Sequence, residues 1–439
     1  MSAYTRTPAP QQPQTPGAVL ATLAIPAFRR YLLGQLTSNV GTWMQRAAQD
    51  LLVLHLTGNN GSAVGMVTAL QFLPQTLFSL AGGVLADRCS KRRLLLVTHT
   101  GMAVQSLLLG LFTVTGAVSL PLVYTLAFAL GTATAIDSPA RSAFVSELVT
   151  RERVATAVSL NSTQFNVARI LGPAAAGLTA AAVGVGPVFL INAVSYLAVL
   201  YGLLTPVGGL QGPAPSEHGG TRLRDAFRHI ASTPELRLPI TLIAFVSTFG
   251  FNFQVTTSLM AITVFHSDAA AFGCLSAGYA VGSLVGAILG ARIKRPPTGR
   301  RLVTATVAFG LLEATLGLMP GYDTFLALLV PTGYAAVTIT MTANSLIQLH
   351  AEPHLRGRVL SAYFLVLLGG TPVGAPLVGL VSDAYGARWT LLLGGLVSTL
   401  AAVTCSPLTF MLQRQAPPWR TGDQAGERLV DTRDFRPRR

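Results

Sequence analysis

Two charged residues lie one helical turn apart inside a strongly apolar stretch of the chain. Arg46 and Asp50 both fall within GTWMQRAAQDLLVL, residues 41–54. A charge in apolar surroundings is costly unless a partner, water or a ligand compensates it. Asp50 could exchange a proton as solvent and ligand come and go, whereas a guanidinium stays charged. The pair is therefore either a structural ion pair or a device that couples proton movement to ligand binding.

The polar residues around this pair recur at steps of three and four, which places them on one face of a helix. Apolar residues such as Leu36, Val40 and Leu51 take the opposite face. A face this polar predicts the wall of a water-filled cavity and not a surface in contact with lipid. Its residues are Gln35, Ser38, Asn39, Thr42, Gln45, Arg46, Gln49 and Asp50.

Further polar residues interrupt other apolar runs. Asn166 and Arg169 precede a Gly-Pro pair, Gln71 and Gln75 stand on either side of a proline, and Asn252 lies in a threonine-containing stripe. These side chains could contact a small molecule inside a cavity, or they could only hydrogen-bond from helix to helix. The sequence leaves both readings open.

Glu313 is an isolated acid within another apolar run. A structural hydrogen bond explains it more simply than a role in transport. Together with Asp50 and Arg169 it remains a candidate for a coupling residue, because ionisable groups at such depth are costly to maintain.

The composition indicates a membrane-embedded chain. Of its 439 residues 51% are hydrophobic and only 11% are charged, and the mean hydropathy is +0.53. Twelve apolar runs are long enough to cross a bilayer as helices. They cover residues 31–56, 62–86, 94–116, 119–141, 155–181, 184–206, 236–262, 269–291, 301–320, 323–347, 359–382 and 387–411.

The basic residues lie in alternate connections between these runs. Clusters follow the second, fourth, sixth, eighth and tenth runs, whereas the opposite connections hold a single arginine, Arg388. Because cytoplasmic loops are enriched in Lys and Arg, both termini are predicted to be cytoplasmic. The net charge of +14 is spread over many short clusters, which argues against a nucleic-acid-binding surface.

The two halves of the chain resemble each other. RERVATAVSLN opens the fifth run and RGRVLSAYFLV opens the eleventh. A repeat of six helices predicts two bundles related by a pseudo-two-fold axis, with a site at their interface. The predicted parts are a disordered cytoplasmic leader (1–28), an N-terminal six-helix bundle (29–206), a cytoplasmic linker (207–235), a C-terminal six-helix bundle (236–411) and a basic cytoplasmic tail (412–439).

Two motifs resemble those of the major facilitator superfamily. GGVLADRCSKRRLLL, residues 82–96, is similar to the loop motif between helices two and three. ARILGPAAAG, residues 168–177, resembles the helix-five motif of drug/proton antiporters. Over residues 28–410 the chain looks like the exporter-like branch that includes siderophore and macrolide efflux proteins. The matching positions are Gly83, Asp87, Arg88, Lys91 and Arg92 in the first motif and Gly172, Pro173 and Gly177 in the second.

This resemblance implies an all-α membrane protein with twelve transmembrane helices that works by alternating access. It also implies proton-coupled efflux of a hydrophobic or siderophore-like small molecule from the bacterial inner membrane, by a monomer without a cofactor. A cytoplasmic gate would be latched by Asp137 with Lys91 or Arg92, and by Asp87 with the helix start near Gly357. An importer or facilitator of the same fold remains an alternative, and a non-transporting receptor is a more distant one.

Enzymatic and metal-binding functions find no support in the sequence. The chain lacks the G-x-x-x-x-G-K-[ST] phosphate loop and the H-E-x-x-H zinc motif. Cys89, Cys274 and Cys405 are too far apart to suggest a disulfide framework or a metal site. His350 and His354 flank a proline that breaks the helix needed to align them, so no metal site is predicted.

Overall fold

The computed structural model describes residues 16–205, 223–292, 297–352 and 355–414, and within these residues every regular element is a helix. The N-terminal half contains α1 (Pro16–Leu23), α2 (Pro26–Thr57), α3 (Gly61–Arg88), α4 (Lys91–Val114), α5 (Leu120–Glu147), η1 (Arg151–Arg153), α6 (Val154–Val183) and α7 (Val185–Leu204). The C-terminal half contains α8 (Leu223–Ser232), α9 (Pro234–Phe245), η2 (Val246–Gly250), α10 (Phe253–Leu259), η3 (Met260–Val264), α11 (Ala269–Arg292), α12 (Gly299–Leu318), α13 (Tyr322–His350), α14 (Arg356–Tyr385) and α15 (Ala387–Arg414).

Twelve of these segments are long enough to span a membrane. Ten pass a test of length and apolarity, and α3 adds an eleventh as a bent span. The twelfth, α2, has 32 residues, enough for about 48 Å of helix, but its polar face lowers its hydropathy. The predicted all-α fold with twelve transmembrane helices is therefore confirmed.

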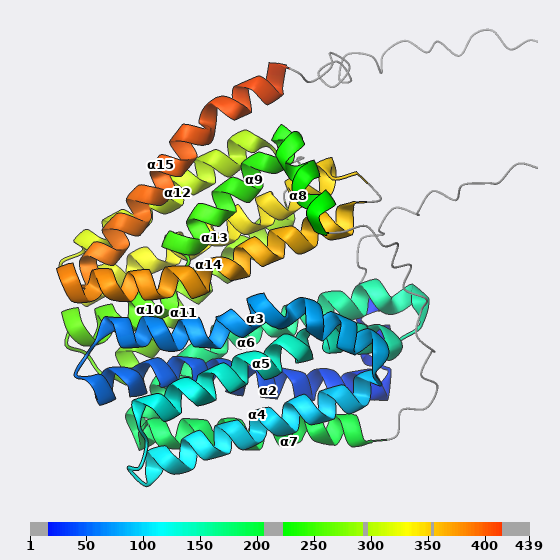
Figure 1. The fold of residues 1–439 in the computed structure, drawn as a ribbon, viewed down its shortest axis with the longest axis vertical. Helices are drawn as coiled ribbons and strands as arrows, with labels where there is room; N and C mark the ends of the chain where they lie inside the picture. The colour runs from blue at the N-terminus through cyan, green and yellow to red at the C-terminus, as the bar shows by residue number, and fades with distance from the viewer. Residues whose placement is uncertain (1–15, 206–222, 293–296, 353–354, 415–439) are drawn as a thin grey trace, which may run out of the picture.

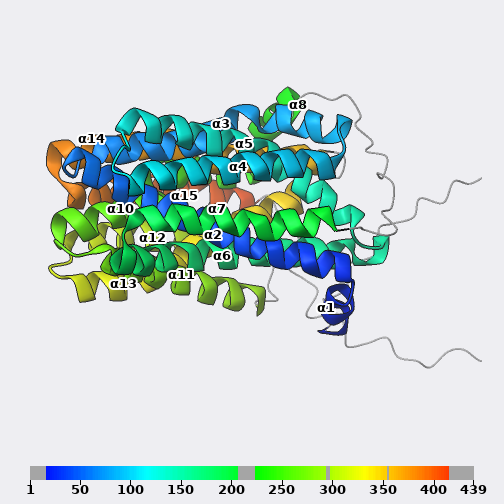
Figure 2. The same ribbon diagram turned by 90° about the horizontal axis from the view of Figure 1, so that it is seen from below.

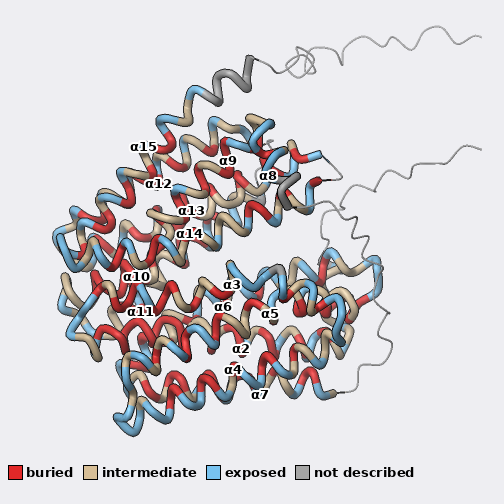
Figure 3. Tube along the Cα trace, in the orientation of Figure 1, coloured by how far each residue is buried: buried red, intermediate tan, exposed pale blue. Residues whose placement is uncertain are grey.

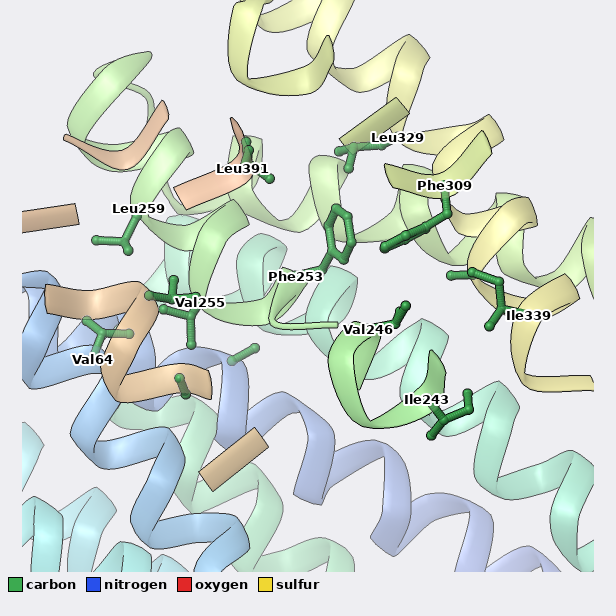
Figure 4. Packing of buried hydrophobic residues seen from close by; sticks show 14 of the residues in the cluster. Val64, Ile243, Val246, Phe253, Val255, Leu259, Phe309, Leu329, Ile339 and Leu391 are labelled. Atoms are coloured by element: carbon green, nitrogen blue, oxygen red, sulfur yellow. The ribbon is translucent and has the colours of Figure 1, made fainter. Parts of the chain in front are cut away.

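The helices form two groups, with α2–α7 in one and α9–α15 in the other (Figure 1). Exposed residues lie mostly on the outer faces of the helices, and buried residues lie mostly where helices face one another (Figure 3). Large apolar residues on the outer faces, such as Leu197, Leu311 and Leu400, suit contact with lipid. The buried apolar core of the C-terminal group surrounds Phe253, Phe309 and Leu329 (Figure 4).

The contacts between the two groups show the predicted pseudo-two-fold arrangement. Span five (α6) packs against span eight (α11), and span eleven (α14) packs against span two (α3). Adding six to span five gives span eleven, and subtracting six from span eight gives span two, so each contact is the counterpart of the other in the opposite half. Both α6 and α14 are 30 residues long, hold an internal proline and end at a glycine with positive φ, Gly184 and Gly386.

The predicted leader and the predicted linker both contain helical residues. Pro16–Leu23 form α1 beside the start of α2, where Pro26 occupies the first helical turn, a position that tolerates proline (Figure 2). The predicted leader is thus helical in part, and residues 1–15 lie outside the described part of the chain. The predicted linker contains α8, which packs on α9 and α14. Residues 206–222 and 415–439 also lie outside the described residues.

Span seven is not a continuous α-helix. α9 passes into a π-helical turn at Val246–Gly250, Phe251 and Asn252 leave helical geometry, and α10 follows. A second π-helical turn, Met260–Val264, ends the span. π-Helical turns inside α-helices are rare and frequently occur at functional sites.

The two bundles meet at one end and diverge toward the other. We call the end with the tight connections 58–60, 184 and 386 the short-loop end, and the end with the basic connections the basic end. A Cβ built on Gly65 of α3 would lie 2.3 Å from the Ala375 carbonyl oxygen of α14. Gly83, near the other end of α3, has nothing within 4 Å, and neither has Gly357 of α14. The bundles are therefore sealed at the short-loop end and separated at the basic end.

Candidate functional site

Asp50 lies on the seam between the two bundles. Its side chain is fully buried. The Gln254 amide of α10, in the other bundle, donates a hydrogen bond of 2.8 Å to Asp50 Oδ2. The Thr68 hydroxyl of α3 donates a longer one, 3.5 Å, to Oδ1. Asp50 thus connects the N-terminal and C-terminal bundles directly.

Arg46 does not pair with Asp50, although both residues are described and lie one turn apart. Its guanidinium lies over the Phe72 ring, 4.5 Å from the centroid, and 5.0 Å from the centroid of Trp43. Its Nε is buried without a hydrogen-bond partner. Aromatic rings attract a cation without neutralising it. The structural ion pair allowed by the sequence is therefore not formed, and Asp50 is held by neutral donors.

Most of the polar face of α2 points into the N-terminal bundle and not toward the other bundle. Gln35 contacts His99 of α4 at 3.0 Å. Gln45 donates to Gln105 of α4 at 2.9 Å. Other side chains of the face also find partners within the N-terminal bundle: Asn39 donates to Gln164, Thr42 bonds Tyr196, and Gln49 accepts from Gln71. The face therefore forms a buried hydrogen-bond network, and only its Asp50 end reaches the seam.

Asp137 belongs to this buried network in the described state. It is buried and lies 3.6 Å from His99 Nε2 and 3.5 Å from Arg141 Nε. In the described state Asp137 does not pair with Lys91 or Arg92, because α5 continues to Glu147, ten residues or about 15 Å beyond Asp137. His99 and Arg141 were missed, although DSPAR places an acid and an arginine four residues apart.

The basic motif after α3 is bound within the N-terminal bundle. Lys91 pairs with Glu147 at 3.1 Å. Arg92 donates to the carbonyls of Leu203, Leu204 and Thr205 at the end of α7. Asp87, Arg88, Lys91 and Arg92 line a recess of about 680 Å³ at the basic end. The close approach to α5 is made by Gly82, whose Cβ would lie 2.5 Å from the Ala135 oxygen, and not by Gly83.

The helix-five motif brings helices together on both sides of α6. A Cβ at Gly172 would lie 2.3 Å from Trp43 Cβ of α2, inside the bundle. A Cβ at Gly177 would lie 2.4 Å from the Ala269 oxygen of α11, across the seam. Pro173 lies between them within α6. Small residues allow this close approach in membrane helices, so the motif packs α6 against α2 and seals the short-loop end.

The other predicted site residues differ in how far they are buried. Asn166 and Arg169 of α6 are exposed, and Arg169 lies within electrostatic reach of Tyr279 in α11. Gln75 is half-buried near Pro74. Asn252 is buried at the break in span seven, close to Gly374 of α14. Glu313 is buried in the C-terminal bundle, and its Oε2 lacks the structural hydrogen bond expected there.

No group of three or more His, Cys, Asp or Glu suited to a metal ion occurs within the described ranges. His350 Nδ1 contacts the Leu346 carbonyl oxygen at 2.9 Å, and His354 lies outside these ranges. The three cysteines are free.

Residues 17–428 match the family model of the transmembrane secretion effectors, a branch of the major facilitator superfamily. The chain belongs to this family. Its fold agrees with solved transporters of the superfamily. A bacterial homologue of the lysosomal transporter Spinster, inward-facing and occupied, gives a TM-score of 0.69 at 14% identity and covers 92% of this chain and 100% of that one. The inward-open xylose transporter XylE of Escherichia coli gives 0.66 at 12% identity, covering 89% and 96%.

Relatives of this secretion effector include siderophore transporters. The enterobactin exporter EntS of Citrobacter koseri is 26% identical over 405 residues, covering 90% of this chain and 94% of its own. The staphyloferrin A transporter of Staphylococcus aureus is 24% identical over 370 residues, covering 82% and 90%. These proteins and the family are transporters and not enzymes. The chain is thus a multi-pass membrane protein and a secondary transporter.

Proposed function

We propose that this transporter exports a siderophore-like small molecule across the bacterial inner membrane in exchange for protons. The observation that carries the proposal is the position of Asp50, which is buried on the seam and held across it by Gln254. A group that loses a partner whenever the bundles separate can link its protonation to their movement.

The direction of coupling follows from the cost of burying a charge. When the short-loop end is open, Asp50 is separated from Gln254 and meets water. Closing the seam around an ionised carboxylate costs free energy, because two hydrogen bonds from neutral donors offset only part of its lost hydration. A proton taken up from the short-loop side neutralises Asp50 and favours closure. Proton uptake on that side thus returns the transporter to the state open at the basic end.

The basic end is proposed to face the cytoplasm. The positive-inside rule supports this orientation, with both termini on the same side. The described state is then open to the cytoplasm and ready to take up a molecule for export. Nothing in this cycle requires a second copy of the chain, and we propose that a monomer suffices.

The substrate is proposed to carry anionic or strongly polar groups. Arg46 Nε has no hydrogen-bond partner, and Arg169 of α6 is exposed. A guanidinium binds carboxylate and phenolate oxygens through paired N–H donors. The exposed Phe165 ring on α6 could pack against an aromatic portion of the same molecule. The relatives' names agree with such a ligand.

The proposal is tested with inside-out membrane vesicles that contain the full chain. Energised vesicles should accumulate iron-free enterobactin or staphyloferrin A, and a protonophore should abolish the accumulation. Vesicles without the chain serve as the control. Accumulation in right-side-out vesicles instead would identify an importer, and accumulation that survives the protonophore would refute proton coupling.

A further inference from the structure

Glu313 of α12 is a buried acid that the proposed transport cycle does not use. Its side chain is 2% exposed, and Oε2 has no hydrogen-bond partner. The carboxyl group occupies space left by two glycines. A Cβ on Gly250 of η2 would lie 3.0 Å from Oε2, and a Cβ on Gly394 of α15 would lie 2.9 Å from Oε1. The chain therefore leaves room for a carboxyl group at this position in the C-terminal bundle.

The surroundings of Glu313 hold polar atoms that also lack partners. Ser398 Oγ and Thr399 Oγ1 of α15 are buried without hydrogen bonds. Ser398 Oγ lies near the carboxyl, because the same Cβ on Gly250 would meet it at 3.1 Å. The Phe309 ring closes another side, 2.7 Å from that Cβ. Buried polar atoms without partners are uncommon, so the pair of Glu313 Oε2 and Ser398 Oγ beside Gly250 needs a physical explanation.

No cation compensates Glu313 among the described residues. Tyr279 of α11 is the titratable group within its electrostatic reach. The remaining charged or titratable residues of the helices packed against α12 lie toward the helix ends. They are Glu235 and Arg237 of α9, Tyr322, Asp323 and His350 of α13, and Arg388 and Cys405 of α15, with Tyr334 inside α13.

We propose that Glu313 is a proton-binding site of the C-terminal bundle, distinct from Asp50, and that it holds a proton in the state open at the basic end. A buried carboxyl without a cation or a donor is far cheaper to maintain in its neutral form. The protonated group carries no net charge, so it leaves no unpaired ion in these surroundings. The inference goes beyond the proposed function, because it holds whether or not Asp50 exchanges a proton.

A proton fits the site better than a metal ion. Hard cations such as Ca²⁺ take six to eight oxygen ligands. Glu313 is the one carboxylate at this site within the described residues, and an aromatic ring occupies one side of it. A proton needs only the carboxyl oxygen that binds it.

The position of the site suggests when the proton leaves. Gly250 ends the π-helical turn of span seven, and Phe251 and Asn252 after it are not helical. Interrupted helices beside a central site can change shape as the bundles rock. A shift at this break moves Gly250 away from the carboxyl and admits water, which stabilises the ionised form. The proton on Glu313 is then exchanged when span seven changes shape.

The test is infrared difference spectroscopy of the full chain in lipid nanodiscs without substrate. At neutral pH the wild type should show the C=O stretch of a protonated carboxyl, and raising the pH should remove it. Because Asp50 is proposed to be protonated in the same state, the test uses an Asp50→Asn background, which should retain a band from Glu313. Adding Glu313→Gln to this background should remove the band. A band that persists in the Asp50→Asn, Glu313→Gln variant overturns the proposal, as does loss of the Asp50→Asn band when sodium replaces choline as the only cation.

In the same Asp50→Asn background, Glu313→Asp keeps the test decisive if the Glu313→Gln variant does not fold. Its carboxyl is one methylene shorter and should give a band at a shifted frequency. An unchanged band would show that another acid is responsible. Because the measurement needs neither substrate nor a proton gradient, its failure is separate from a failure of coupled export.

Discussion

The Asp50 carboxylate of α2 accepts a hydrogen bond of 2.8 Å from the Gln254 amide of α10, across the seam between the two bundles. A second acid crosses the same seam, but this one belongs to the C-terminal bundle and accepts hydrogen bonds from the N-terminal bundle. Asp383 of α14 accepts from the backbone N–H groups of Gly61 and Ser62 at the start of α3, at 2.6 and 2.8 Å. Each bundle thus offers a carboxylate to the other, and both contacts must break when the short-loop end opens.

Asp383→Ala should weaken the closed short-loop end. The substitution leaves the Gly61 and Ser62 N–H groups without their acceptor, a loss of about 1–3 kcal/mol. Spin labels at His55→Cys and Tyr385→Cys, on opposite bundles near this end, should report longer distances in a larger share of molecules. Asp323→Ala, which removes an acid near the same end of α13, is the control. Identical distance distributions in all three proteins would contradict the proposed seal.

Gly177 and Gly83 should have opposite effects on the conformational equilibrium. Gly177→Ala places a Cβ 2.4 Å from the Ala269 oxygen of α11, so it should favour opening of the short-loop end. Gly83→Leu has free space in the described state, but it obstructs any approach of α14 at the basic end. It should therefore favour the described state. The same pair of spin labels measures both effects, and a shift in the same direction for both variants would contradict the account.

Asp137→Ala should strongly destabilise the N-terminal bundle. Removing the acid leaves Arg141 buried without its carboxylate and takes a partner from His99. Breaking a buried ion pair in this way costs about 3–5 kcal/mol. Glu147→Gln breaks the more exposed pair with Lys91 and should cost about 1 kcal/mol or less. Thermal unfolding in detergent compares the two variants. Equal losses of stability would show that the buried pairs of Asp137 contribute no more than the more exposed Lys91–Glu147 pair.

Cys89 reports the orientation of the chain. It is exposed at the basic end, directly after α3. In a Cys274→Ser, Cys405→Ser background, a membrane-impermeant maleimide should label it in inside-out vesicles and not in intact cells. Thr115→Cys, at the short-loop end after α4, should show the reverse pattern when Cys89 is also replaced by serine. Labelling of Cys89 in intact cells would invert the proposed orientation and hence the direction of transport.

The sequence predicts the spans well because each depends on local composition. Apolar length and basic connections locate twelve helices without reference to their neighbours. The ends are less accurate: α5 extends to Glu147 instead of ending near residue 141, because polar residues such as Asp137 and Arg141 are buried within the bundle. The error placed Asp137 near a helix end and not within the bundle.

Partners of polar residues were not predictable in the same way. The periodicity of α2 defines a polar face, but it does not say which helix covers that face. Gln45 bonds Gln105 and Asn192, which lie 60 and 147 residues away in the chain. The break in span seven had a local signal, the glycine and asparagine of FGFN, yet its contact with Glu313 depends on tertiary packing.

The most direct test of the coupling role of Asp50 compares two modes of transport in proteoliposomes. Asp50→Asn keeps a side chain of similar shape that cannot exchange a proton. It should lose accumulation of labelled iron-free enterobactin driven by a pH gradient, and it should retain exchange of labelled for unlabelled substrate without a gradient. Asp323→Asn should retain both modes. Gradient-driven accumulation by Asp50→Asn at the wild-type rate, with wild-type proton flux, would contradict the account.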